Sequence, residues 1–191
     1  MTRKIDGKHA CSFTGHRPER LELTEAQVIQ WLSEQIRQAV EDGYTEFVSG
    51  MQRGVDIWAA EEVLKLREQG AAVRLIAASA FEGMESRWSN DWRARYERIL
   101  EEADEVTFVS RIPGRRAFFQ RNHWMVDRST RLIGVYTGAP GGTKETIEYA
   151  KMRGLQVVLI DAERRKNIEP DRRVHAALYL FVSRLSGTLL L

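Results

Sequence analysis

Residues 131–143 read Arg-Leu-Ile-Gly-Val-Tyr-Thr-Gly-Ala-Pro-Gly-Gly-Thr, and this stretch decides the fold class. A short apolar run leads into a glycine-rich turn, and a helical pattern over 142–153 follows directly. A strand that passes through such a turn into a helix directs free backbone N–H groups at one point, with the positive end of the helix dipole behind them. The junction is therefore typical of an anion site, most often one for phosphate.

The same alternation of strand and helix extends along most of the chain. Short apolar runs predict strands at 8–14, 44–49, 72–78, 104–109, 131–136 and 155–160. Amphipathic segments predict helices at 24–42, 55–68, 86–102, 115–129 and 142–153, and a last helix at about 170–186. This pattern predicts an α/β fold: a doubly wound, mainly parallel sheet of about six strands with helices on both faces. We expect a single domain over residues 1–191.

Composition restricts the function classes. The 29 basic and 27 acidic residues give a formal net charge of +2, so a broad nucleic-acid footprint and strong DNA binding are not expected. The one cysteine, Cys11, lies in the first apolar run; it allows no internal disulfide, and we assign no metal ligands. Because the chain shows neither a signal-peptide pattern nor a membrane-spanning run, we expect a cytoplasmic protein without membrane contact.

In a doubly wound fold, ligands bind outside the carboxyl ends of the strands, so the residues that follow each strand deserve inspection. After the first strand come Thr14, Gly15, His16 and Arg17. Gly15 allows a sharp turn and a close ligand approach, Thr14 offers a hydroxyl, and His16 and Arg17 present adjacent donors that suit a phosphate. The alternative is an ordinary turn with a surface arginine.

The loop after the second strand is bracketed by Gly50 and Gly54, and a helix follows at Val55. Asp56 lies in the first turn of that helix, where it would either cap the helix or bind a ribose hydroxyl. Glu61 lies on the same helix and would be a solvated charge or, alternatively, a catalytic or metal-binding carboxylate. This loop is the second predicted wall of the site.

Two further segments supply candidates. Arg121 and Asn122 interrupt the apolar start of the helix at 115–129, which suggests a polar pocket beside them. Gly141, Gly142 and Thr143 open the helix at 142–153, and the Thr143 hydroxyl could cap this helix, contact a phosphate, or both. In contrast, Trp88, Trp92 and Tyr96 recur every four residues, a stripe that we interpret as core rather than as a platform for stacking bases.

Taken together, these motifs resemble the YpsA-like family of the SLOG superfamily, whose Rossmann-like members include the DNA-processing protein DprA and the LOG-type phosphoribohydrolases. The resemblance covers about residues 8–160. It is carried by Thr14-Gly15-His16-Arg17-Pro18, Ser49-Gly50, the run 54–61, Ala103-Asp104, Arg121-Asn122 with Met125 and Asp127, and Gly142-Thr143 with Thr146. It implies a Rossmann-like sheet and a pocket for a nucleotide or a nucleotide-derived ligand such as NAD or ADP-ribose.

The resemblance also bears on catalysis. LOG-type enzymes carry Gly-Gly-x-Gly-Thr-x-x-Glu, with a catalytic glutamate at the last position; when Gly142-Thr143 is laid on their Gly-Thr, that position is Thr146. A threonine cannot replace a carboxylate in acid–base chemistry. We therefore expect a binding protein with a sensor or regulatory role and assign no catalytic residue. Two alternatives stay open: a nucleotide hydrolase that uses Asp56, Glu61 or Glu145, and a DNA-processing or protein-interaction module. A homo-oligomer is also left open.

Overall fold

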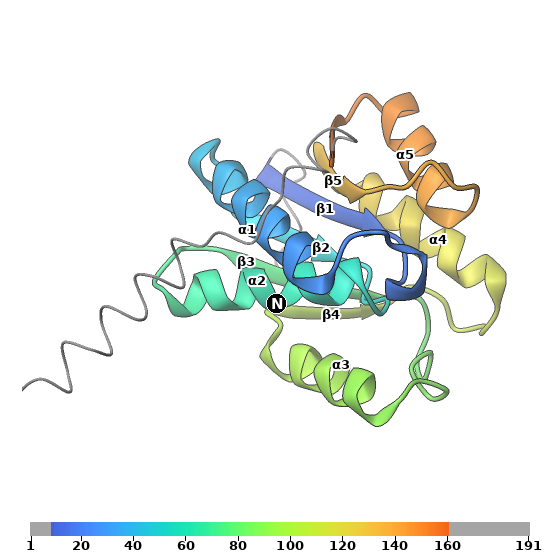
Figure 1. Cartoon of the computed structure of the whole chain (residues 1–191). Helices are drawn as coiled ribbons and strands as arrows, with labels where there is room; N and C mark the ends of the chain where they lie inside the picture. Colours follow the sequence, from blue (N-terminus) through green and yellow to red (C-terminus); the bar gives the residue numbers. More distant parts are fainter. Residues whose placement is uncertain (1–8, 161–191) are drawn as a thin grey trace, which may run out of the picture. The chain divides into compact units, whose positions relative to one another are not determined.

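The computed structural model describes residues 9–160 (Figure 1). In it, the predicted strands form a single parallel sheet and the helices connect them. The strands are β1 (Ala10–Gly15), β2 (Glu46–Ser49), β3 (Arg74–Ser79), β4 (Glu105–Phe108), β5 (Arg131–Val135) and β6 (Gln156–Leu159). The helices are η2 (Pro18–Arg20), α1 (Glu25–Glu41), α2 (Val55–Glu68), α3 (Asn90–Glu102), α4 (Arg115–Val126) and α5 (Gly142–Met152). The predicted α/β fold class is confirmed. The helix predicted at 170–186 lies outside the described residues.

The strand order reverses its direction at one point in the sheet, between β1 and β5. The six strands lie in the order β4-β3-β2-β1-β5-β6, and every neighbouring pair is parallel. The chain builds outward from β1 to β4 and then returns to the other side of β1 to place β5, so β1 and β5 flank the switch point. Their register pairs Thr14 with Gly134 and Gly15 with Val135, which aligns the two carboxyl ends.

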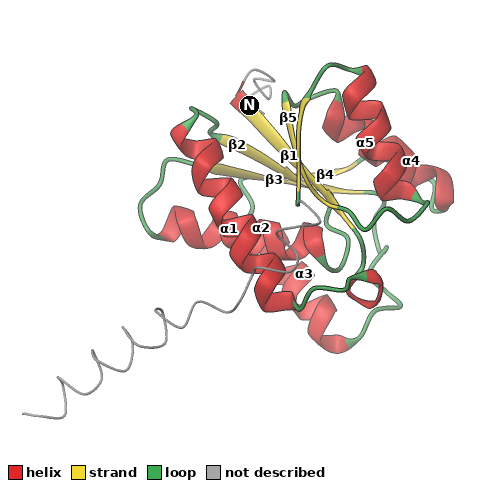
Figure 2. Ribbon diagram, turned by 45° about the horizontal axis from the view of Figure 1, so that its top comes forward, coloured by secondary structure: helices red, strands yellow, loops and turns green. Residues whose placement is uncertain are grey.

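Helices cover the two faces of the sheet separately (Figure 2). α1, α2 and α3 pack beside one another on one face, and α4 packs beside α5 on the other. The inner strands are consequently buried on both sides, and Cys11 on β1 is 0% exposed, so it packs as a small apolar residue. Burial raises the pKa of its thiol well above the ordinary range.

Helix boundaries follow local signals with one notable difference. Thr24 begins α1 with a capping box in which its hydroxyl accepts from Gln27 N at 3.3 Å, and Gly43, at φ +92°, follows its end. The helix predicted from residue 86 instead begins at Asn90. Hydrogen-bonded turns, among them Trp88 N to Glu85 O at 2.8 Å, occupy the preceding residues, and extended backbone at Ser89 starts the helix.

Candidate functional site

A cavity of about 480 Å³ opens at the carboxyl ends of β1 and β5, beside the switch point. Loops that follow β1, β2 and β5 form three of its walls, and α4 forms the fourth. It is lined by Phe13, Thr14, Gly15, His16, Arg17, Glu19, Arg20, Gln52, Asp56, Phe118, Arg121, Asn122, Gly141, Gly142 and Thr143. The structure thus brings together ten of the twelve predicted site residues, all except Gly50 and Gly54.

The loop after β1 passes close to the start of α2. A Cβ at Gly15 would lie 2.4 Å from the side chain of Val55, so glycine is required for this approach. His16 is 4% exposed, and its ring stacks on Tyr136 with the centroids 5.6 Å apart. Arg17, in contrast, is exposed at the mouth of the cavity. The loop therefore presents one fixed imidazole and one cation that is free to reorient.

Asp56 and Arg121 form a buried ion pair in the wall of the cavity. Arg121 Nη1 lies 3.0 Å from Asp56 Oδ2, and the two residues are 4% and 6% exposed. The Gln52 N–H also donates to Asp56 Oδ2, at 3.3 Å. Burial raises the pKa of the Asp56 carboxyl, while the charge of Arg121 opposes that rise. From the sequence we expected Asp56 either to cap the helix or to bind a ribose hydroxyl. In the structure its side-chain partner is Arg121, which is 65 residues away in the chain.

The two remaining predicted glycines serve packing within the protein. A Cβ at Gly50 would lie 1.5 Å from Arg121 Nη1, because the guanidinium lies directly over this residue. Gly54 has φ +96°, and a Cβ there would lie 2.8 Å from the carbonyl oxygen of His16. Both glycines support the wall from behind and are not among the residues that line it.

The start of α5 forms another wall of the cavity. Gly141 is its N-cap, and the first N–H to bond back along the helix is that of Glu145, which donates to Gly141 O at 3.1 Å. The preceding N–H groups, from Gly142 to Lys144, have no partner within the helix. Thr143 does not cap this helix, so that part of the prediction is wrong: its hydroxyl donates to Gly15 O at 3.0 Å and ties α5 to the β1 loop.

Thr143→Val is expected to lower the free energy of unfolding by roughly 0.5–1.5 kcal/mol, because the partly buried hydrogen bond to the Gly15 carbonyl is lost while the side-chain shape is kept. Urea denaturation monitored by fluorescence measures this loss. Thr107→Val on β4, whose hydroxyl makes no hydrogen bond within residues 9–160, is the control. Equal losses in the two variants would show that the tie contributes nothing.

One side of α4 lines the cavity with Phe118, Arg121 and Asn122. Arg121 and Asn122 follow Phe118 by three and four residues, so the three side chains share one face of the helix. Sequence reasoning missed Phe13, Glu19, Arg20, Gln52 and Phe118. Helical spacing from Arg121 and Asn122 points to Phe118. Glu19 and Arg20 belong to the short helix η2, directly after the predicted loop, so a slightly longer loop would have included them.

Comparison with known proteins identifies the family. The model of the YpsA family, described as the YspA SLOG family, matches residues 11–163. The chain belongs to the YpsA family of SLOG proteins. A UPF0398 protein of Halalkalibacterium halodurans is 33% identical over 126 residues, which are 64% of this chain and 67% of the relative. A UPF0398 protein of Bacillus cereus strain G9842 is 29% identical over 152 residues, 75% of this chain and 83% of the relative.

Solved structures support the same fold. DNA processing protein A from Helicobacter pylori, whose structure is described for its single-stranded DNA binding mode, superposes with a TM-score of 0.55 at 16% identity. DprA from Streptococcus pneumoniae gives 0.54 at 19% identity. The matches cover 78% and 79% of this chain but only 64% and 50% of those chains. They show a shared SLOG-type fold. Within residues 9–160, no helix has both the length and the apolar character that a membrane crossing requires.

Of the three carboxylates considered for catalysis, Asp56 lines the cavity and Glu61 and Glu145 do not. Glu61 accepts hydrogen bonds from Arg95 and Arg98 on α3. Thr146, at the position of the LOG-type glutamate, is 2% exposed, and its hydroxyl donates to Gly142 O at 2.7 Å. The carboxylates that line the cavity are Glu19, paired with Arg53, and Asp56, paired with Arg121.

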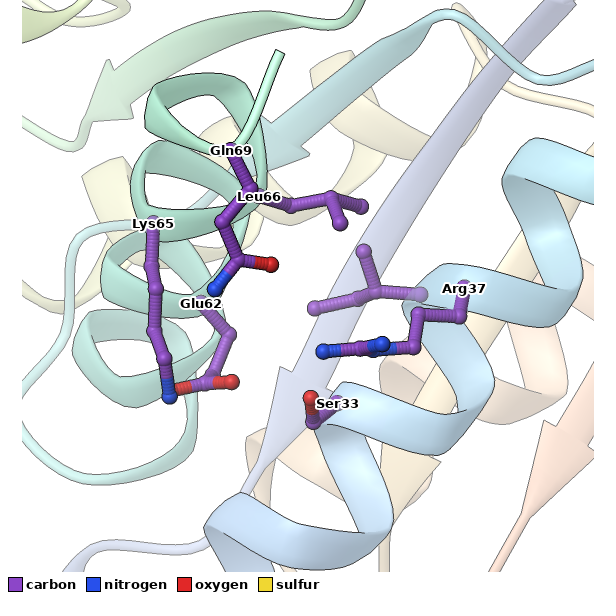
Figure 3. A pocket seen from close by; sticks show the side chains of 7 residues that line it. Ser33, Arg37, Glu62, Lys65, Leu66 and Gln69 are labelled. Carbon is purple, nitrogen blue, oxygen red and sulfur yellow. The ribbon is translucent and has the colours of Figure 1, made fainter. Parts of the chain in front are cut away.

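A shallow depression lies between α1 and α2 and shares no lining residue with the cavity (Figure 3). Arg37 of α1 and Lys65 of α2 border it, and Lys65 is paired with Glu62 at 3.3 Å. The depression is a shallow contact between two helices and offers no enclosed site for a ligand.

Proposed function

We propose that this protein binds a nucleotide-type ligand, such as NAD or ADP-ribose, in the cavity beside the switch point, as a cytoplasmic sensor or regulatory protein. The observation that carries the proposal is the convergence of the α5 N-terminus and the β1 loop on one cavity of about 480 Å³. Parallel sheets of this class bind ligands at this place, and the unpaired N–H groups of a helix start favour a phosphate. The volume suits a compact organic ligand.

The walls offer complementary roles for the parts of such a ligand. The N–H groups of Gly142 and Thr143 would face the phosphate, and the exposed guanidiniums of Arg17 and Arg20 would add charge at the mouth. The amide of Asn122 can both donate and accept, which suits ribose hydroxyls. None of these roles needs a catalytic carboxylate, so the loss of the glutamate at Thr146 is compatible with binding.

The start of α5 allows a sharp test. Gly142→Asp would place a carboxylate where we propose that the phosphate binds, while a Cβ at Gly142 meets its nearest atom, Asn122 Nδ2, at 3.8 Å. Helix starts tolerate aspartate well, so the fold should persist. We expect Gly142→Asp to weaken NAD or ADP-ribose binding at least about tenfold in isothermal titration.

The matched control is Gly142→Asn, which has nearly the same size without the charge. It should lose much less affinity than Gly142→Asp. If the folded wild-type protein binds none of NAD, ADP-ribose, ADP or AMP, the proposal is wrong.

A DNA-processing role is the second candidate, because the fold is similar to that of DNA processing protein A. The net charge of +2 speaks against strong binding to a polyanion, since phosphate neutralisation drives most of such affinity. A gel shift with single-stranded DNA at several salt concentrations distinguishes the two candidates. A tight, salt-dependent shift would favour DNA over a free nucleotide.

A further inference from the structure

A second hollow, of about 560 Å³, adjoins the cavity along the carboxyl edge of the sheet. It lies between the loop after β2 and the turns that lead from β3 into α3. Its lining consists of Arg17, Gln52, Arg53, Met84, Arg87, Trp88, Ser89, Trp92 and Phe118. Three of these residues, Arg17, Gln52 and Phe118, also line the first cavity, so the two spaces share a wall.

Three aromatic residues, Trp88, Trp92 and Phe118, are among those that line the second hollow. The stripe on the α3 segment was predicted to be core, but only Tyr96 is, at 2% exposed. Trp88 and Trp92 are half-buried and line the hollow. The Tyr96 ring meets Trp88 edge-on, with ring centroids 5.5 Å apart. The Trp92 ring centroid lies 6.0 Å from that of Trp58, and the Arg95 guanidinium lies over the Trp92 ring, 4.7 Å from its centroid. Because Arg95 already occupies one face of Trp92, Trp88 is the indole that better suits stacking against a flat base.

Positive charge surrounds the rings. Arg53 is paired with Glu19 at 2.7 Å, whereas the side chains of Arg17 and Arg87 make no ion pair or hydrogen bond within residues 9–160. Arg17 lies at the boundary, since it lines both spaces. A cation at this boundary would meet the middle of any ligand that extends from one space into the other.

We propose that the ligand has two bases joined through a pyrophosphate, and that the second base stacks on Trp88 in the second hollow. This inference rests on the proposed function and extends it. One nucleoside phosphate occupies the first cavity, Arg17 holds the pyrophosphate, and the second base enters the hollow. Two adjoining spaces, aromatic rings in one and a helix N-terminus in the other, match a dinucleotide better than a mononucleotide.

The test uses the full chain and compares its binding of NAD, which carries two bases, with its binding of ADP, which carries one. The wild-type protein should bind NAD more tightly than ADP. Trp88→Ala should weaken NAD about tenfold, because a stacked base contributes roughly 1–3 kcal/mol, and should leave ADP affinity unchanged. Trp88→Phe keeps an aromatic ring and should recover part of the NAD affinity. Arg17→Ala should weaken both ligands, since it lines both spaces.

The outcomes distinguish a failure of the two-base assignment from a failure of nucleotide binding itself. Equal loss of NAD and ADP in folded Trp88→Ala, or no loss of either, would overturn the two-base assignment while nucleotide binding stands. Failure of the wild type to bind either ligand would overturn both. Binding of a single-stranded oligodeoxynucleotide that displaces NAD and is lost in Trp88→Ala would assign the hollow to DNA and overturn the inference.

Discussion

Arg121→Met is expected to lower the free energy of unfolding by about 3–5 kcal/mol at pH 7, the cost of leaving one partner of a buried ion pair uncompensated. The guanidinium lies 3.0 Å from the Asp56 carboxylate, and both residues are more than nine-tenths buried. Methionine fills a similar apolar volume, so most of the loss reflects the charge that remains on Asp56. Urea denaturation at several pH values measures the effect.

The pH dependence identifies the cause. Burial raises the pKa of Asp56, and the charge of Arg121 opposes that rise, so the pKa in Arg121→Met rises further. A carboxyl with a raised pKa binds its proton more tightly when folded, so stability falls as pH increases from the unfolded pKa toward the folded one. The deficit of Arg121→Met relative to wild type should therefore shrink as the pH is lowered from 7 toward 4.

Arg116→Met provides the matched control, because Arg116 lies on the same helix and is exposed. It should change stability by less than about 0.5 kcal/mol. A deficit in Arg121→Met that stays constant with pH would mean that lost packing, and not the stranded carboxylate, causes the destabilisation.

Gly50→Ala is expected to cost about 3 kcal/mol of stability and to weaken ligand binding. The added methyl group would lie 1.5 Å from Arg121 Nη1 and 2.6 Å from Asp56 Oδ2, so the ion pair must separate or move. Overpacking alone typically costs about 1–3 kcal/mol, and displacement of a buried pair adds to this. Denaturation and NAD titration of the same sample measure the two effects together.

Gly138→Ala separates steric clash from backbone strain. Gly138 has φ +91°, but a Cβ there meets nothing within 4 Å, so its cost should be limited to about 1–2 kcal/mol of backbone strain. Gly50 has no such φ, so its penalty is steric. Once Arg121→Ala has removed the guanidinium, adding Gly50→Ala should cost clearly less than it does in the wild type, with only the contact to Asp56 Oδ2 at 2.6 Å left to relieve. If the double variant loses the full sum, the clash with Arg121 is not the cause.

Local pattern was sufficient for the architecture. Apolar runs and helix-cap signals such as Thr24 and Gly43 depend on neighbours within a few residues, so they predict the strands and helices with small boundary differences. The rule that parallel strands end at one edge then selected the loops containing Arg17, Asp56 and Gly142, which do line one cavity.

What the sequence determined by itself is thus the parallel α/β fold and the set of loops at its carboxyl edge. Only the tertiary structure decided the partners within that edge. Arg121 reaches Asp56 across 65 residues, and Gly50 is glycine because of that contact. Trp88 and Trp92 show helical spacing typical of core, yet they line a hollow. Burial and ion pairing depend on which elements meet in space, and local spacing does not carry that information.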